Sequence, residues 1–241
     1  MKERLDRLLV ERGLVESREK GQACIMAGEV LVNGQKAAKS GQLIDPQATI
    51  ELLSRPRYVG RGGLKLEAAL GGFGVDPAGK ICIDIGSSTG GFTDCLLQHG
   101  AAHVFAIDTG TGQLDWKLRQ DPRVTLRENC NARFLKPEDI GELADLLVCD
   151  VSFISVTLIL PAAAPLLNPG GEMVILVKPQ FEVGKGQVGS GGIVREPELH
   201  RFACDRVVGA VQALGYSSQL MDSPILGAEG NREFLLHARA T

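Results

Sequence analysis

The sequence lacks the cysteine spacing of a zinc site, and its residues 1–11 do not resemble a signal peptide. Its six cysteines stand at least 13 residues apart, so no Cys-x-x-Cys pair is present. We therefore expect reduced thiols, no metal site and a cytoplasmic location. Residues 151–171 carry no charge, but three prolines interrupt them. Because a membrane-spanning helix needs about 20 mostly apolar residues, we expect a strand end and a core helix there, and no membrane contact.

The composition is that of a globular protein. Hydrophobic residues make up 44% of the chain and charged residues 23%, which excludes a wholly disordered chain. The 30 glycines follow no three-residue period, which excludes collagen and leaves them for turns and close backbone approaches.

The charge is divided unevenly along the chain. Residues 1–65 hold 12 Lys and Arg against 8 Asp and Glu, and are therefore net positive. Residues 66–241 hold 14 against 21 and are net negative. A basic first segment on an acidic body suggests that the first segment binds a polyanion.

The first fifty residues predict two short helices and a hairpin. The first helix begins near Leu5 and stops at Gly13, and Ser17 caps a second helix that ends at Gly28. Asn33-Gly34 between short apolar runs is a strong hairpin signal, and a turn over 43–46 and another strand over 49–52 are expected after it.

This pattern resembles the RNA-binding domain named after a small-subunit ribosomal protein, over residues 3–52. The resemblance implies an RNA-binding α+β domain over residues 1–55, followed by a linker over 56–63. Basic side chains suited to phosphate contacts are Arg4, Arg7, Arg18, Lys20, Lys36, Arg57 and Arg61.

Residues 64–241 predict an α/β domain in which strands alternate with helices. Helices are expected over 64–70, to residue 98 and over 196–214. Strands are expected over 80–85, 104–108, 124–126, 146–149, 173–177, 218–221 and 234–238. This alternation is typical of a parallel, doubly wound sheet, whose ligands bind at the carboxyl ends of the strands.

A glycine-rich turn after the first of these strands predicts a nucleotide-type cofactor. The sequence from Asp84 to Gly91 lacks the second glycine of the dinucleotide fingerprint and has no P-loop lysine. Asp108 ends the next strand, where an acidic residue accepts hydrogen bonds from ribose hydroxyls. S-adenosylmethionine therefore fits better than NAD. The expected cofactor residues are Asp84, Gly86, Ser87, Ser88, Gly90, Gly91, Phe92, Asp108, Asn131 and Asp150.

Within this set, individual roles can be suggested. Gly86 leaves room for the methionine part of the cofactor, and Asp84 orients the loop or meets the cofactor's ammonium group. Asn131 faces the adenine edge or is an ordinary turn residue.

Three ionisable residues lie at strand ends, and a fourth lies in the helix before the first strand. Asp150 and Lys178 end their strands, Glu233 opens the last strand, and Lys65 lies in the helix. A lysine at the end of a buried strand needs a partner, so these groups form either a functional site or structural ion pairs.

The motifs around these four residues resemble the TlyA family of RNA 2'-O-methyltransferases, also called haemolysins. They run from Arg61 to Leu66, Asp84 to Thr93, Cys149 to Ser155, Val177 to Glu182, and Gly230 to Phe234. The body alone resembles FtsJ/RrmJ-like methyltransferases. The resemblance implies a Rossmann-like S-adenosylmethionine-dependent fold and a catalytic tetrad of Lys65, Asp150, Lys178 and Glu233. It also implies ribosomal RNA, as free RNA or in a subunit, as substrate, with cytidine as the nucleotide. A glycine-rich run over 184–195 is expected to be a loop near the substrate.

The family's mechanism suits these residues. Lys178 can polarise a ribose 2'-hydroxyl or accept its proton, a role that a positive neighbour such as Lys65 favours. Asp150 fixes the amine, and Glu233 orients Lys65 or the ribose. Alternatives are a non-catalytic RNA- or ribosome-binding protein, a pore-forming cytolysin and, more distantly, an NAD dehydrogenase.

Overall fold

The computed structural model describes residues 2–15, 17–26, 28–37, 39–53, 57–227 and 230–241. They form two compact units, Met1–Arg57 and Tyr58–Thr241. The boundary expected after residue 55 lies outside the described residues. Tyr58 was expected in the linker, but its buried side chain belongs to the core of the second unit. The helix expected from residue 64 begins earlier, at Gly62.

The first unit contains the expected helix pair and hairpin. Its elements are β1 (Glu3–Arg4), α1 (Leu5–Glu11), α2 (Arg18–Met26), β2 (Val30–Val32), β3 (Gln35–Lys36), β4 (Leu43–Ile44) and β5 (Ile50–Leu52). The Ser17 hydroxyl accepts the Lys20 N–H, which confirms the expected cap. Asn33 and Gly34 both have positive φ, the conformation that a tight hairpin turn requires. Strands β1 and β4, which pair with each other, were not predicted as strands because each is only two residues long.

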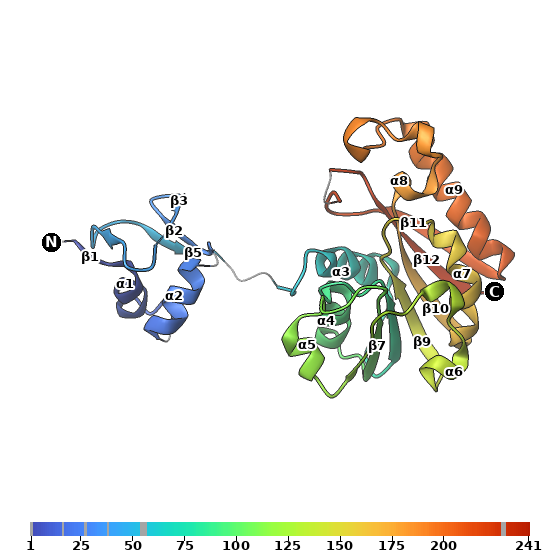
Figure 1. Ribbon diagram of the computed structural model, residues 1–241, viewed down its shortest axis with the longest axis horizontal. Coiled ribbons are helices and arrows are strands. Elements are labelled where there is room, and N and C mark those ends of the chain that lie inside the picture. Colours follow the sequence, from blue (N-terminus) through green and yellow to red (C-terminus); the bar gives the residue numbers. More distant parts are fainter. Residues whose placement is uncertain (1, 16, 27, 38, 54–56, 228–229) are drawn as a thin grey trace. The chain divides into compact units, whose positions relative to one another are not determined.

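The second unit is built on a seven-stranded sheet, and Figure 1 shows it with helices on both sides. Its strands are β6 (Ile81–Ile85), β7 (His103–Ile107), β8 (Val124–Arg127), β9 (Ala144–Cys149), β10 (Leu167–Val177), β11 (Tyr216–Asp222) and β12 (Phe234–Ala240). They lie in the order β11-β12-β10-β9-β6-β7-β8. The expected parallel, doubly wound sheet is confirmed, except that β12 runs antiparallel to both of its neighbours.

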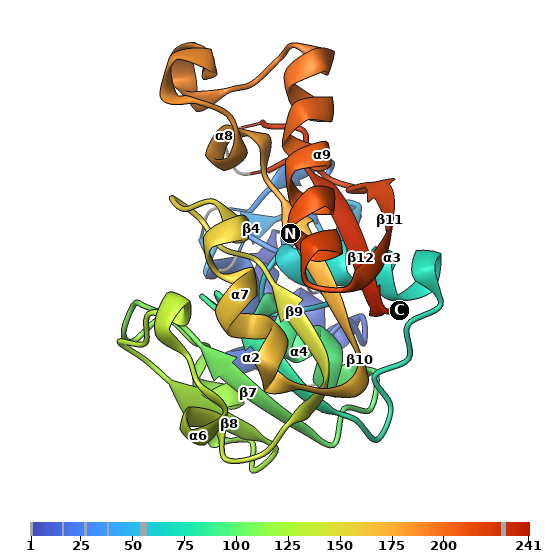
Figure 2. The same cartoon turned by 90° about the vertical axis from the view of Figure 1, so that its right-hand side faces the viewer.

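Two hydrophobic clusters hold helices against opposite faces of this sheet. Alternate residues along the strands, such as Cys82 and Ile83, belong to different clusters, as the period of a strand requires. One cluster includes residues of α3 (Gly62–Phe73), α4 (Gly91–Gln98) and α5 (Trp116–Gln120). The other includes residues of α6 (Pro137–Ile140), α7 (Leu160–Ala163) and α9 (Pro197–Ala213), and Figure 2 shows α7 and α9 together on that side.

The uncharged stretch 151–171 is not one long helix. It contains the short helical turns η2 (Val156–Leu158), α7 and η3 (Ala164–Leu166), and then the first part of β10. Its prolines Pro161 and Pro165 lie in first turns, where a missing N–H is tolerated. Among the described residues, no helix is long and apolar enough to cross a membrane.

Four neighbouring parallel strands end at one edge of the sheet. The residue that directly follows each of β6, β7, β9 and β10 is Gly86, Asp108, Asp150 and Lys178, respectively. The fold thus brings together residues that are up to 92 positions apart in the sequence. This carboxyl edge is where open α/β sheets bind ligands.

Candidate active site

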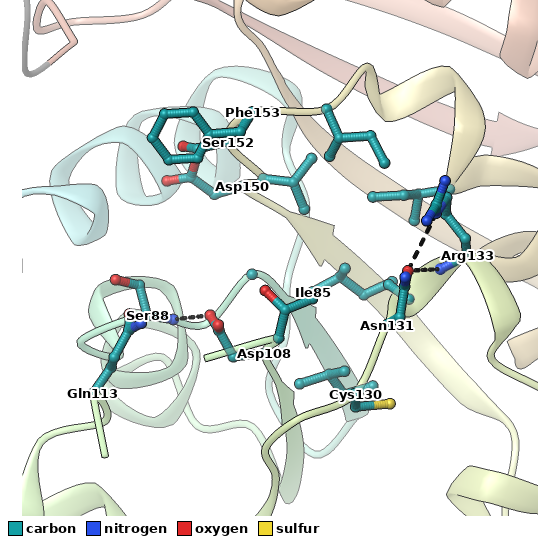
Figure 3. A pocket seen from close by; sticks show the side chains of 17 residues that line it. Ile85, Ser88, Asp108, Gln113, Cys130, Asn131, Arg133, Asp150, Ser152 and Phe153 are labelled. Atoms are coloured by element: carbon teal, nitrogen blue, oxygen red, sulfur yellow. Dashed lines mark hydrogen bonds between the residues drawn. The ribbon is translucent and has the colours of Figure 1, made fainter. Parts of the chain in front are cut away.

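Two adjoining cavities lie at the carboxyl edge of the sheet. One has a volume of about 430 Å³ and the other about 260 Å³. Four residues line both of them: Gly86, Ser88, Asp150 and Ser152. Figure 3 shows the larger one, with Asp108 on one side, Asn131 and Arg133 on another, and Phe153 at a third.

The glycine-rich turn passes so close to its neighbours that it tolerates no larger residue at Gly86. Gly86 has φ +84°, and a Cβ there would lie 2.3 Å from the Asp150 carbonyl oxygen. Gly90 has φ +97°, and a Cβ would lie 2.2 Å from Leu118. The buried Ser87 hydroxyl lines the smaller cavity and has no hydrogen-bond partner among the described residues. A buried hydroxyl without a partner is a candidate ligand contact.

Asp108 fixes the shape of the larger cavity. One carboxylate oxygen accepts the Ser88 N–H at 2.8 Å, and the other accepts the Gly110 N–H at 2.7 Å. The side chain thereby ties the turn after β6 to the loop after β7. Each oxygen keeps a further lone pair, so the carboxylate can still accept from a ligand hydroxyl.

Asp84 is a buried residue of β6. Its side chain is fully buried and lines neither cavity. One of its oxygens accepts the Thr93 hydroxyl at 2.6 Å, which links β6 to the first turn of α4. This contact lets Asp84 orient the loop, one of the two roles expected for it, and its other carboxyl oxygen has no hydrogen-bond partner among the described residues. Burial raises the pKa of the Asp84 carboxyl to about 7.

This raised pKa predicts a pH-dependent stability. Between pH about 4 and 7 the carboxyl is protonated when folded and ionised when unfolded, so the free energy of unfolding should fall as pH rises. Asp84→Asn should remove much of this fall, and the exposed control Asp205→Asn should keep it. Urea titrations at several pH values test this. The same fall in wild type and Asp84→Asn would refute the assignment.

The remaining cofactor residues lie at the cavities, with one exception. Gly91 and Phe92, at the start of α4, line the smaller cavity, whereas Gly90 packs on Leu118 and lines neither. Asn131 lines the larger cavity. Its side-chain oxygen accepts the Arg133 N–H at 3.2 Å, so it is a turn cap as well as a lining residue.

The four expected catalytic residues line the smaller cavity, where they form two ion pairs. The Lys178 ammonium lies 2.6 Å from Asp150 and donates to the Ser152 hydroxyl at 2.8 Å. The Lys65 ammonium lies 2.5 Å from Glu233. Lys65 and Glu233 are buried, and removing either partner would leave a buried charge uncompensated. Asp150 and Ser152 also line the larger cavity, so the Lys178 contacts lie where the two cavities meet.

Comparison with known proteins places this architecture in a family. Residues 58–240 match the FtsJ-like methyltransferase family, and residues 3–50 match the S4 domain. The chain belongs to the FtsJ-like methyltransferases. The TlyA resemblance is likewise confirmed, because relatives bearing that name match nearly the whole chain.

This FtsJ-like methyltransferase has relatives in several bacteria. It is 46% identical, over 98% of its length and 89% of theirs, to the 16S/23S rRNA (cytidine-2'-O)-methyltransferase TlyA of Mycobacterium tuberculosis. It is 44% identical to Hemolysin A of Brachyspira hyodysenteriae, over 97% of this chain and 98% of that one. A solved structure from Streptococcus thermophilus, named as a hemolysin, has a TM-score of 0.76 and 49% identity, covering 100% of this chain and 89% of that one.

Sequence reasoning missed Phe153 as a site residue of this methyltransferase. Phe153 lines the larger cavity, is 92% exposed and has φ +67°. Such a backbone conformation is strained for a bulky residue and is often found at functional sites. Its ring lies 5.5 Å from that of Phe181. No sequence pattern marks positive φ at a phenylalanine. The available signal was the place of Phe153 in the Cys149–Ser155 motif, three residues after Asp150.

The basic residues expected to bind RNA differ in their exposure and in the ion pairs that they form. In the S4 domain, Arg4 and Arg18 both contact the buried Asp6 carboxylate, whose pKa is held below its usual range chiefly by the Arg4 hydrogen bond. Arg7 pairs with Glu11 at 2.7 Å. Lys36 is exposed on the hairpin, Lys20 is half-buried, and Arg57 is exposed. Arg61 is exposed and lines the smaller cavity beside Lys65.

The glycine-rich segment 184–195 is anchored by a residue that sequence reasoning did not single out. The fully buried Asn231 accepts the Val194 N–H at 2.9 Å and donates to the Gly192 carbonyl at 2.8 Å. Val194 packs with Val183 and Ala203 in a small cluster. Two hydrogen bonds therefore hold Gly192 and Val194 of the expected loop to Asn231, which lies two residues before Glu233.

Proposed function

We propose that this chain transfers the methyl group of S-adenosylmethionine to a ribose 2'-hydroxyl of ribosomal RNA, at cytidine. The observation that carries the proposal is the Lys178 ammonium, held by Asp150 and Ser152 where the two cavities meet. The relatives named as rRNA (cytidine-2'-O)-methyltransferases support the substrate. Family membership and four matching ionisable residues in one cavity support the reaction.

The cavity residues fit S-adenosylmethionine. Gly86 brings the backbone close without a side chain, Asp108 offers a carboxylate to a ribose, and the Ser87 hydroxyl lacks a protein partner. Asn131 and the apolar side chains Ile107 and Ile159 line the cavity where an adenine would be bound. When bound, the cofactor supplies an electrophilic methyl group on a positively charged sulfur.

The chain's own residues then position and activate the hydroxyl. Lys178, with its ammonium fixed by Asp150 and Ser152, can hold the 2'-oxygen by a hydrogen bond and accept its proton once deprotonated. The Lys65–Glu233 pair lines the same cavity and contributes a second oriented donor. Correct placement of the hydroxyl lowers the entropic barrier, which accounts for much of the rate in such transfers.

The substrate RNA is proposed to be bound by both units. The S4 domain offers exposed Arg4, Arg7, Arg18 and Lys36 to phosphates, although three of them are partly neutralised by carboxylates. In the second unit, Arg61 places a positive charge at the smaller cavity. The exposed Phe153 ring is suited to stack on the target base, because single-stranded bases are commonly recognised by stacking on aromatic side chains. We propose a cytoplasmic ribosomal partner.

The decisive experiment is methyl transfer by the purified full chain from radiolabelled S-adenosylmethionine. Free rRNA and both ribosomal subunits are offered, and modified riboses are mapped. The proposal expects label on a cytidine 2'-oxygen. Cofactor binding without transfer to any of these RNAs would favour the non-catalytic RNA-binding alternative. Because one relative is named Hemolysin A, membrane lysis is a second readout. It is measured on lipid vesicles with the same purified protein.

Asp108→Ala should weaken cofactor binding while leaving RNA binding nearly unchanged. Loss of a charged acceptor is expected to cost about 1.5–3 kcal/mol of binding free energy, or roughly 10- to 150-fold in Kd. The variant also loses the two N–H contacts that hold the Ser88 and Gly110 loops, which acts in the same direction. Calorimetry measures cofactor affinity and filter binding measures RNA affinity. Unchanged cofactor affinity would remove Asp108 from the site.

A further inference from the structure

Glu182 is a buried carboxylate for which the reaction proposed above has no role. It ends the short helix α8 (Pro179–Glu182), four residues after Lys178. The residue is 2% exposed, and burial raises the pKa of its carboxyl. A buried carboxyl must be satisfied by hydrogen bonds, and its partners show what it holds in place.

Both carboxyl oxygens of Glu182 contact the end of the loop that follows β9. The Ser155 hydroxyl donates to one oxygen at 2.5 Å, and the Val156 N–H donates to the other at 2.8 Å. On the other side, the Arg206 guanidinium of α9 donates to the Glu182 carbonyl at 2.6 Å. Glu182 thus joins α8, α9 and the start of η2.

The loop that Glu182 holds carries Asp150 and Ser152, which line both cavities of the candidate active site. Asp150 and Ser152 contact the Lys178 ammonium, and Phe153 packs against Phe181, the residue before Glu182. The segments 150–156 and 178–182 therefore meet at three places: at the ion pair, at the two rings and at Glu182. The ion pair joins side chains that are 12% and 21% exposed and the Phe153 ring is exposed, whereas the Glu182 contact is the most deeply buried of the three.

We infer that Glu182 is a positioning residue: through Ser155 and Val156 it sets the loop so that Asp150 and Ser152 fix the Lys178 ammonium for reaction. The inference rests on the proposed function, in which Lys178 handles the 2'-hydroxyl. A displacement of about 1 Å in a reacting group can lower the rate by about 10²-fold. Loss of the two Glu182 hydrogen bonds would free the loop to make such a displacement.

A second buried carboxylate, Glu172 in β10, provides a matched control. Glu172 lies in the middle of β10, whereas Lys178 follows the end of that strand. It is 8% exposed and contacts His237 at 3.1 Å and Arg239 at 2.9 Å. It lines neither of the two site cavities. Glu172→Ala should therefore destabilise the same sheet without disturbing the site.

The experiment compares Glu182→Ala, Glu182→Gln and Glu172→Ala in the full chain, at a temperature where all are folded. Glu182→Ala should lower kcat by about 10- to 100-fold and leave the Kd for S-adenosylmethionine within about twofold. Amide hydrogen exchange over residues 151–154 should become faster. In Glu182→Gln the amide oxygen can accept the Val156 N–H and the amide nitrogen can donate to Ser155, so kcat should stay within about threefold of wild type. Glu172→Ala should change neither kcat nor this exchange.

Each outcome decides a separate point. If Glu182→Ala is folded and keeps its kcat, or if exchange over 151–154 is unchanged, Glu182 does not position the loop. Equal loss of kcat in Glu172→Ala would show a general stability effect and would also overturn the inference. A wild-type chain without methyl transfer would refute the proposed function instead, while the exchange measurement would still test whether Glu182 holds the loop.

Discussion

Lys178→Ala is expected to fold, bind S-adenosylmethionine and lose methyl transfer by about 10²–10⁴-fold, the usual contribution of a positioned acid–base group. The Lys178 ammonium contacts Asp150 and Ser152, polar groups at the carboxyl edge of the sheet, and does not belong to either hydrophobic cluster of the sheet. The fold should therefore survive. Calorimetry with the cofactor and single-turnover methyl transfer measure the two properties separately.

Lys178→Arg separates the two roles that the ammonium group can play. Arginine keeps the positive charge and can still pair with Asp150, but it does not deprotonate in proteins. If Lys178 accepts the hydroxyl proton, this variant should be almost as inactive as Lys178→Ala. Activity retained in Lys178→Arg would leave only electrostatic positioning. Activity retained in Lys178→Ala, with RNA and cofactor bound, would refute the tetrad.

The sequence predicted those features of the fold that depend on local pattern. Apolar runs of four to six residues marked the central strands, and the residue after each run marked the carboxyl edge, so Asp108, Asp150 and Lys178 were correctly expected to converge. Asn33-Gly34 marked the hairpin because few residues accept its positive φ. The antiparallel β12 could not be predicted from the same patterns, since strand direction depends on the connection and not on the strand's own residues.

Contacts between distant segments account for the features that could not be predicted from the sequence. Asp84 lies near the end of β6, where a ligand contact was expected, and its buried side chain accepts the hydroxyl of Thr93, nine residues later. Glu182 and Ser155 are 27 residues apart and meet only when β9 and β10 pair. Arg4 and Arg18 were expected to bind phosphates, and each also forms an ion pair with the Asp6 carboxylate. Such partners follow from tertiary packing, which no local pattern encodes.

The buried pair of Lys65 and Glu233 should show the largest stability effect. Lys65→Met leaves the Glu233 carboxylate, 3% exposed, without its cation, and should lower the free energy of unfolding by about 3–5 kcal/mol. Glu233→Gln should also destabilise, because it leaves the Lys65 ammonium buried beside a neutral amide. A urea titration of each variant measures the change.

The double variant Lys65→Met/Glu233→Gln distinguishes a structural pair from a catalytic one. Replacing both charges removes the uncompensated group, so stability should return to within about 1–2 kcal/mol of wild type, with a coupling of at least about 1 kcal/mol in the double-mutant cycle. If the pair serves only the fold, methyl transfer should return together with stability. If the pair orients the ribose, as its place in the cavity beside Lys178 and Arg61 suggests, the double variant should be stable and still impaired by at least about tenfold. Full activity in a stable double variant would reduce the reacting set to Lys178 and Asp150, with Lys65 and Glu233 as structural neighbours.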